Sequence, residues 1–352
     1  MDPGGRPGNG ARRGGGRTDA SNHGAGRALS EAVGAVDPRR SHRPLWWIGE
    51  VVLLAGAVWL LRHELRAVSL QEIVGELRAL PARRVWAALL LTGAGYLAFA
   101  GYDFVALRHL KRSLSVSRVI ISSFIVYALA NNAPLSFLVG GSVRYRFYSK
   151  WGLGSKDTTA LVLLNVLTYA LGLATAAGMA FTLEPAAVPQ ILKLPFHSTR
   201  PLGVAALVVV GAYLVASAYG KPLRLRRWEL APPPFYTSLL QIAVSLADWL
   251  LSGAALFVLL PLPHAHPLSQ FGFFGFFGLF LLGQLAALIA QIPGGLGVFE
   301  AVMLVTLAPV LPAAAVFSAL LAYRVIYYFL PLVVAAVLLG VRQMTHLRRL
   351  RV

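Results

Sequence analysis

The stretch QIPGGLGVFE, residues 291–300, breaks a long apolar run near the end of the chain. Proline removes a backbone donor, and paired glycines are poor helix formers. Glu300 follows at once, and a charge at membrane depth costs about 2.5 kcal/mol or more. Irregular backbone at that depth is tolerated only where protein or water satisfies it. The stretch therefore predicts a broken membrane helix that lines an interior cavity.

Composition places the chain among membrane proteins. Of its 352 residues, 57% are hydrophobic and 13% are charged, which is far from the balance of a water-soluble domain. A bilayer core of about 30 Å needs about 20 apolar residues per helix. The sequence predicts an all-α polytopic membrane domain over 44–345, with no separate soluble enzyme domain. About six full spans are expected, at 45–61, 85–107, 158–182, 201–219, 236–260 and 313–340.

The two ends of the chain are polar and basic. Residues 1–43 are rich in glycine and arginine, and this composition predicts a disordered tail, because it lacks the apolar surface needed to offset chain entropy. The basic run before the first span suits a cytoplasmic segment near anionic lipid. A solvating tail that only orients the first helix explains it equally well. Residues 346–352 form a second basic cytoplasmic tail.

Several functional classes are excluded by the sequence. The net charge is +18, but the arginines flank the spans and form no stripe, so no nucleic-acid partner is expected. Without cysteine there is no disulfide or thiolate metal site, and the eight histidines show no ligand spacing. No P-loop, GxSxG or HExxH motif occurs. We therefore expect no metal, no cofactor and no catalytic residues.

Loop charges predict the orientation of the spans. Basic residues gather in 108–118, in 220–230 and after Val341, whereas 261–270 has no charged residue. The positive-inside rule then places both termini in the cytoplasm and 261–270 outside. The loop 62–84 should be outside yet holds five arginines. Its segment SLQEIVGELRALP has helical apolar spacing, which predicts an amphipathic helix on the outer surface.

Two apolar stretches, 119–150 and 271–309, contain helix breakers. The predicted orientations of the neighbouring spans require each stretch to begin and end on the same side of the membrane, which predicts two re-entrant helical hairpins. The order span, span, broken hairpin, span then occurs twice, in 45–182 and in 201–341, with opposite orientation. Matched breaks in inverted halves point to a transport site, although glycine and proline in membrane helices can also serve packing alone. The predicted breaks are Asn131, Asn132, Pro134, Gly140, Gly141, Pro293, Gly294 and Gly295.

Charged residues near the breaks are the first site candidates. Superposing the double glycines of GGSVRYR and GGLGVFE places Arg146 opposite Glu300, with Arg144 two residues earlier. We expect a basic group of the first hairpin to pair with Glu300, or both to line one wet cavity.

Other polar residues fall inside the predicted spans. Asp248 is taken as the remaining intramembrane acid, on a stripe with Gln241, Ser245 and Ser252, and Arg324 lies deep in the last span, before a kink expected at Pro331. For Asp248 and Arg324, a functional role and a structural ion pair are both open. The stripe Asn165, Thr168, Gly172 and Thr175 is attributed to contacts between helices. FGFFGFFGLF at 271–280 predicts a glycine packing seam with phenylalanines facing lipid.

Four ordered motifs carry a family resemblance: GGSVRYRFYSKWGL, ADWLLSGAALFVLLP, QIPGGLGVFEAVMLVTL and YRVIYYFLPL. Over roughly 45–345 the chain resembles the membrane region of the lysylphosphatidylglycerol synthetase/flippase family, which also occurs alone in YbhN-type membrane proteins. The resemblance implies movement of aminoacylated phosphatidylglycerol between leaflets. It also implies functional charges at Arg144, Asp248 and Glu300, with Arg324 beside them. Two-domain members continue into a synthetase domain, so synthetase activity is not expected here.

These observations together predict a lipid translocator of a bacterial inner membrane. Arg144 and Arg146 would hold the phosphate of an anionic or aminoacylated phospholipid, while Glu300 and Asp248 would balance its head group. One alternative is a non-transporting scaffold for a separate lipid-modifying enzyme. Another is a head-group transferase that uses Asp248 and Glu300 as acid and base. A homo-oligomer is left open.

Overall fold

The computed structural model describes residues 69–133, 136–185, 198–220, 223–225, 228–230, 233–261, 268–290, 293–307 and 310–349. All of these belong to one compact unit, Glu50–Val352. The tail 1–43, the predicted span 45–61 and Pro134 lie outside the described residues.

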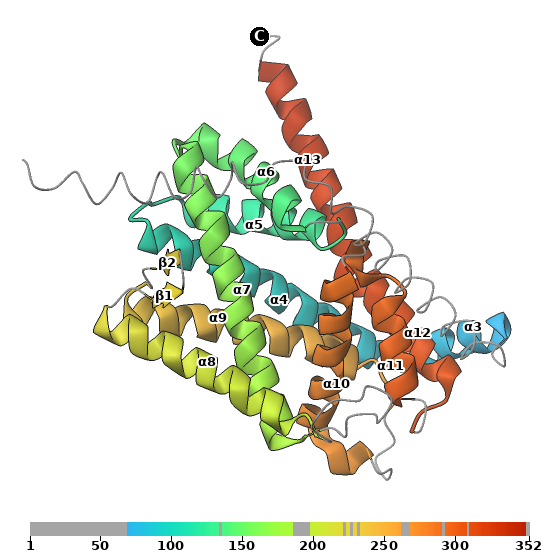
Figure 1. Ribbon diagram of the computed structural model, residues 1–352. Coiled ribbons are helices and arrows are strands. Elements are labelled where there is room, and N and C mark those ends of the chain that lie inside the picture. The colour runs from blue at the N-terminus through green and yellow to red at the C-terminus, as the bar shows by residue number, and fades with distance from the viewer. Residues whose placement is uncertain are drawn as a thin grey trace, which may run out of the picture. The chain divides into compact units, whose positions relative to one another are not determined.

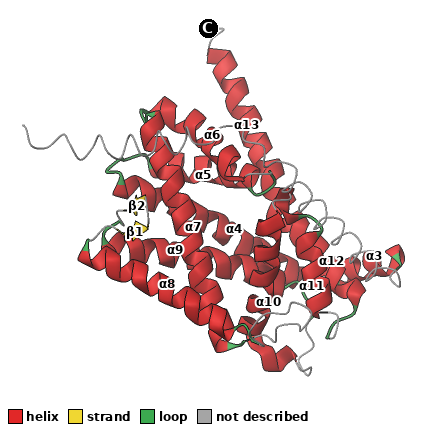
Figure 2. Cartoon of the chain, viewed as in Figure 1, coloured by secondary structure: helices red, strands yellow, loops and turns green. Residues whose placement is uncertain are grey.

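Helices form nearly all of the described structure (Figures 1 and 2). The elements are α3 (Leu70–Ala79), α4 (Ala82–His109), α5 (Val116–Ala130), α6 (Ser136–Tyr148), η1 (Ser149–Trp151), α7 (Ser155–Leu183), α8 (Arg200–Tyr219), β1 (Leu223–Leu225), β2 (Trp228–Leu230), α9 (Phe235–Phe257), α10 (Leu268–Ala290), η3 (Pro293–Gly295), α11 (Val298–Leu307), α12 (Ala313–Tyr323), η4 (Arg324–Phe329) and α13 (Leu330–Arg349). The two short strands pair antiparallel, with Leu223 opposite Leu230. The all-α membrane class is confirmed.

Six of the described helices are long and apolar enough to cross a membrane. Five of them match predicted spans. The sixth, Gly272–Ala290, belongs to the stretch that was expected to form only half-helices. One arm of the second hairpin can therefore cross by length and composition, because its helix runs on to Ala290 after a kink at Gly272. Re-entrance of the hairpins remains a prediction.

The first predicted break is partly confirmed and partly wrong. Between α5 and α6 the helix does stop at Asn131 and Asn132, where the backbone forms a turn. The second break, at Gly140 and Gly141, does not exist, because both glycines lie inside α6. Both face neighbouring helices: a Cβ on Gly140 would lie 3.2 Å from Arg144 Nη1 and 3.6 Å from Val126 Cγ1, and one on Gly141 would lie 3.6 Å from Val162 Cγ2, an ordinary contact distance.

The helix predicted in 69–81 is present as α3. Ser69 and Glu72 form a capping box at its start, in which each side chain accepts from the other's backbone N–H. The helix packs on α12, where Ser318 Oγ donates to the carbonyl of Ile73 at 3.1 Å. Its placement on the outer membrane surface remains a prediction.

Packing between the helices follows a reciprocal pattern. In the predicted repeat, α4 corresponds to α9, α5 to α10, α6 to α11, and α7 to the helix that runs from α12 to α13. Helices α4 and α9 pack along each other (Figure 1). The first arm of each hairpin packs on the last helix of the other half, α5 on α13 and α10 on α7. The second arms, α6 and α11, pack on α7 and α12 of their own halves. Exchanging the halves leaves this pattern unchanged; their inverted orientation remains a prediction.

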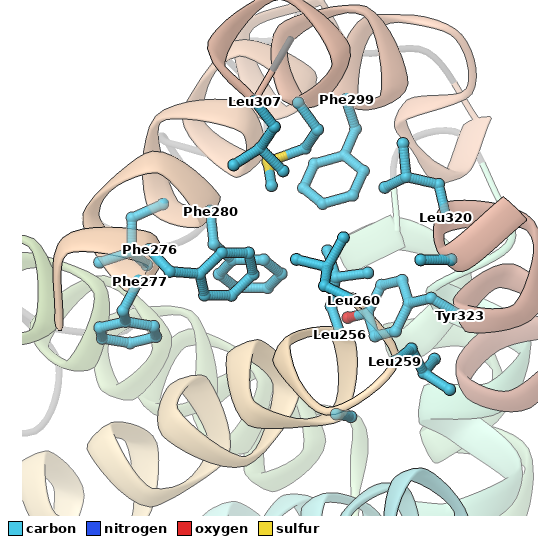
Figure 3. Packing of buried hydrophobic residues seen from close by; sticks show 14 of the residues in the cluster. Leu256, Leu259, Leu260, Phe276, Phe277, Phe280, Phe299, Leu307, Leu320 and Tyr323 are labelled. Carbon is cyan, nitrogen blue, oxygen red and sulfur yellow. The ribbon is translucent and has the colours of Figure 1, made fainter. Parts of the chain in front are cut away.

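Phenylalanines of α10 form part of the main core. Figure 3 shows Phe276, Phe277 and Phe280 in one cluster with Leu256 of α9, with Leu259 and Leu260 just after that helix, and with Phe299 and Tyr323. All three rings are buried, so the expectation that they face lipid is wrong. Positions 276, 277 and 280 share one helical face, and that face meets α9 and α11. A Cβ on Gly253 of α9 would lie 2.6 Å from the Phe277 ring, so this glycine allows the approach.

The closest approach between α7 and α9 gives a first prediction. A Cβ on Gly172 would overlap the side chain of Ser245 and lie 2.9 Å from its carbonyl carbon. Gly172→Ala is therefore expected to lower the free energy of unfolding by about 1–3 kcal/mol, measured by denaturant titration in micelles. Gly211→Ala is the control, because its Cβ meets nothing within 4 Å. Equal behaviour of the two variants would contradict the close packing.

Candidate functional site

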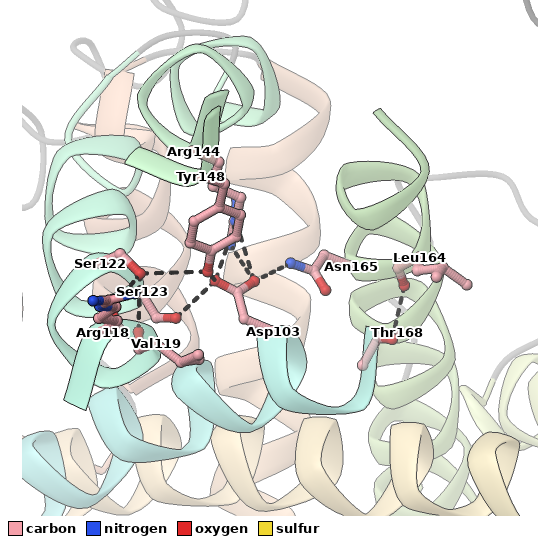
Figure 4. A network of polar contacts seen from close by, with 10 residues as sticks. All are labelled: Asp103, Arg118, Val119, Ser122, Ser123, Arg144, Tyr148, Leu164, Asn165 and Thr168. Atoms are coloured by element: carbon pink, nitrogen blue, oxygen red, sulfur yellow. Dashed lines mark hydrogen bonds and ion pairs between the residues drawn. The ribbon is translucent and has the colours of Figure 1, made fainter. Parts of the chain in front are cut away.

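A fully buried carboxylate, Asp103 of α4, anchors the first hairpin (Figure 4). Arg144 of α6 donates from Nε to Oδ1 at 3.1 Å, and its Nη2 lies 3.1 Å from the same oxygen. Ser123 Oγ and Tyr148 Oη each donate to Oδ2 at 2.7 Å, and Asn165 Nδ2 donates to Oδ1. Donors from α5, α6 and α7 thus converge on one acid of α4. We call this set the first latch.

The Asp103 site was missed by the sequence analysis, which counted Asp248 as the remaining intramembrane acid. Asp103 lies inside the predicted span 85–107, only a few residues before the basic linker 108–118. A simple signal could have revealed it, because a buried Arg144 requires an acid and this span supplies one. Asn165 was assigned to contacts between helices, and it does make one, to Asp103.

A second buried ion pair joins the second hairpin to the last helix. Arg324 Nε donates to Glu300 Oε1 at 2.5 Å, and Arg324 Nη1 donates to the carbonyl of Gly294. Glu300 Oε2 accepts the backbone N–H of Gly297 at 2.8 Å. Both charged side chains are buried, with 5% of Arg324 and 7% of Glu300 exposed. We call this set the second latch.

The expectation that Glu300 pairs with a basic group of the first hairpin is therefore wrong. Arg144 is held by Asp103, and Arg146 is exposed and forms no ion pair with any described residue. The superposition of double glycines failed because the two pairs have different conformations. Gly294 and Gly295 have φ of +60° and +63°, in the left-handed region that favours glycine, whereas Gly140 and Gly141 are helical.

The two breaks meet each other. A Cβ on Gly294 would lie 3.5 Å from the carbonyl oxygen of Asn131 and 3.4 Å from Nη1 of Arg324. Asn132 Nδ2 donates to the carbonyl of Tyr328 at 3.3 Å, as well as to Ala128 within its own arm. The turn of the first hairpin thus contacts both the turn of the second hairpin and the helix that carries Arg324.

The helix that carries Arg324 is irregular at this point. Residues 324–329 form a π-helix, η4, a rare conformation that occurs frequently at functional sites. Pro331 cannot donate to the carbonyl of Tyr327, four residues earlier, and Tyr96 Oη donates to it at 3.2 Å instead. The distortion expected at Pro331 is thus accompanied by a wider helical turn just before it. The side chains of Asn132 and Tyr96 satisfy carbonyls of that turn.

Asp248 lies apart from both latches. It is buried, and Tyr102 Oη donates to its Oδ2 at 3.0 Å while also bonding Ser245 Oγ at 2.7 Å. The predicted stripe on α9 does face the interior: Gln241 Nε2 donates to Thr168 at 2.9 Å, and Ser252 bonds Tyr323 Oη at 2.9 Å. Asp248 has no ion-pair partner among the described residues, whereas Arg324 pairs with Glu300.

An apolar groove of about 360 Å³ opens between α4, α5 and the η4–α13 helix. Its lining includes Leu89, Thr92 and Tyr96 of α4, Phe124 of α5, and Ile326 and Pro331. The volume falls in the range of ligand pockets. The hydroxyl of Thr92 is buried there without a hydrogen-bond partner among the described residues. Tyr96 connects this groove to the carbonyl of Tyr327.

The fold and these interior charges define a class: a multi-pass α-helical membrane protein with two broken segments and buried ion pairs. The chain belongs to the family described as lysylphosphatidylglycerol synthase TM region, whose model matches residues 47–335.

Similar proteins fall into two groups. An uncharacterized protein of Synechocystis is 36% identical over 85% of this chain and 91% of its own length. The inner membrane protein YbhN of Escherichia coli is 30% identical over 85% of this chain and 93% of its own length. Phosphatidylglycerol lysyltransferase of Staphylococcus aureus is 25% identical over 79% of this chain, but the match covers 32% of that protein.

Proposed function

We propose that the chain is a lipid translocator, which moves a phospholipid between the leaflets of a bacterial inner membrane, with both termini in the cytoplasm. Phosphatidylglycerol and its aminoacylated forms are the first candidates, given the name of the Staphylococcus relative. The observation that carries the proposal is the contact between the two breaks at the buried Arg324–Glu300 pair. Broken helices that meet beside buried charge are typical of transport sites.

The proposed path uses the exposed cation first. Arg146 on α6 is exposed and has no ion-pair partner among the described residues, so it can receive a lipid phosphate, whereas Arg144 is paired with Asp103. We propose that the phosphate then competes with Asp103 for Arg144, which releases the first latch and frees the hairpin. Glu300 and Arg324 would meet the head group further in. The acyl chains would remain outside, where the apolar groove between α4, α5 and α13 offers contact to one of them.

Translocation in liposomes tests this proposal. Purified protein is reconstituted with fluorescent phosphatidylglycerol, and a membrane-impermeant quencher reports the rate at which lipid reaches the outer leaflet. Arg146→Gln is expected to slow the rate about tenfold or more, because a hydrogen bond to a charged group contributes about 1.5–3 kcal/mol. Arg146 is exposed, so the substitution should leave folding intact.

Arg112→Gln is the matched control, because it also removes one exposed basic residue, from a pair with Asp157. Its rate should equal that of the unmodified protein. A rate no faster than in protein-free liposomes would reject translocation, and co-purification of a lipid-modifying enzyme would then favour the scaffold. A chemically altered lipid after incubation would favour the transferase.

A further inference from the structure

The described helices bury three acids, and one of them differs from the others. Asp103 and Glu300 each pair with an arginine. Asp248 is 4% exposed and forms no ion pair or hydrogen bond with any lysine, arginine or histidine in the described part of the chain. A carboxylate at this position would be a buried charge without a counter-ion.

Tyrosines are prominent around Asp248. Tyr102 donates the one hydrogen bond that reaches its carboxyl group from a described side chain. Seven tyrosines of α4, α5, α7, α12 and η4 lie close enough to interact electrostatically with Asp248: Tyr96, Tyr102, Tyr127, Tyr169, Tyr323, Tyr327 and Tyr328.

The cost of burying a charge limits the ionisation state that Asp248 can have here. An isolated ionised carboxylate costs far more in a low-dielectric interior than one phenolic hydrogen bond returns. The carboxyl group must therefore be neutralised by a bound cation or by a proton. An amine or metal ion needs space beside the acid, whereas the apolar groove is lined by Tyr96 and not by Asp248. A proton needs no cavity.

We propose that Asp248 is a proton-binding site that couples proton movement to lipid translocation. A proton from one aqueous phase forms an O–H bond with the Asp248 carboxylate, which gives the neutral acid held in the buried conformation described here. The bond breaks when a conformational change admits water, and the proton leaves to the other phase. One proton is carried per cycle, and no other bond changes. This inference rests on the proposed function for its coupling, but not for the proton site itself.

Two residues near Asp248 bond to the helix that carries the second latch. Ser252, one turn along α9, bonds Tyr323 Oη at 2.9 Å, and Tyr323 precedes Arg324 in the chain. Tyr96, another neighbour of Asp248, donates to the π-helical carbonyl of Tyr327. A charge that appears on Asp248 therefore acts on side chains that hold η4, the element that carries Arg324.

Asp248→Asn tests the coupling, because asparagine has the same shape, stays neutral and still accepts from Tyr102. In liposomes with a gradient of one pH unit, the unmodified protein is expected to shift the steady-state lipid distribution by up to about tenfold, the limit for one proton per lipid. Asp248→Asn should show no shift, yet still exchange lipid without a gradient. A full gradient response in Asp248→Asn would overturn the proposal.

Infrared spectroscopy of the purified protein tests the proton site without transport. The unmodified protein at neutral pH should show the C=O band of a protonated carboxyl group, shifted by D₂O and lost in Asp248→Asn. The band should persist in Asp157→Asn, which alters a partly exposed acid. An ionised Asp248 with active translocation would reject this inference and leave the proposed function standing. A protonated Asp248 in a protein that does not translocate lipid would reject the proposed function but support the proton site.

Discussion

Arg324→Gln is expected to lower the free energy of unfolding by about 3–5 kcal/mol, because it leaves Glu300 as an uncompensated buried charge. Among the described residues, Glu300 would keep only the backbone N–H of Gly297 as donor, and the carbonyl of Gly294 would lose the guanidinium. The second hairpin would then lose its attachment to η4. Equilibrium unfolding in mixed micelles, followed by tryptophan fluorescence, measures the loss.

A double substitution separates charge from contact. In Glu300→Gln with Arg324→Gln, neither buried group is charged, so most of the lost stability should return. Arg112→Gln removes an arginine from a pair in which 52% of its side chain is exposed, and should cost less than about 1 kcal/mol. A double variant as unstable as Arg324→Gln alone would show that the ion pair is not the source of the effect.

Asp103→Asn is expected to have a similar effect on the first latch, about 3–5 kcal/mol, because Arg144 remains buried without its acid. Asparagine has nearly the same volume as aspartate, so a large loss of stability would result from the missing charge and not from altered packing. The face of Tyr127, 4.7 Å from the Arg144 guanidinium, compensates only a small part. Chemical denaturation of the purified protein gives the value.

Two further variants calibrate this measurement. Asn165→Ala removes one of the neutral donors to Asp103 and should cost about 1–3 kcal/mol, less than the loss of the acid. Asp157→Asn alters an acid at the surface pair with Arg112 and should change stability by less than about 1 kcal/mol. If Asp103→Asn were no worse than Asp157→Asn, the first latch would not stabilise the hairpin.

Local chemistry predicted the helices and two of the breaks. The proline and glycines at 293–295 break the helix because of their own backbone properties, and the asparagines at 131–132 end α5 as expected. Gly140 and Gly141 misled the prediction because a glycine inside a membrane helix can serve close packing just as well. Sequence alone does not distinguish these roles, since the neighbours Val126 and Val162 come from other helices.

The partners of the buried charges depend on tertiary packing. Glu300 finds Arg324, 24 residues later and beyond α12, rather than the first hairpin. Arg144 finds Asp103, 41 residues earlier on α4. The sequence singled out Arg144, Glu300, Asp248 and Arg324 as candidates, but hydropathy carries no information about which helices become neighbours. Helices α5 and α7, which each pack on both α4 and α6, bring the first pair together, and the second pair joins α11 to η4.

The bond between Asn132 and Tyr328 also has a consequence for biogenesis. These residues are 196 positions apart, so at about 5–20 residues per second a ribosome completes Tyr328 roughly 10–40 s after Asn132. Throughout that interval the Asn132 amide can donate to Ala128 within its own arm, but its second proton needs another partner, such as lipid head groups, water or the insertion machinery. The turn of the first hairpin therefore reaches its final set of hydrogen bonds only after most of the second half has been made.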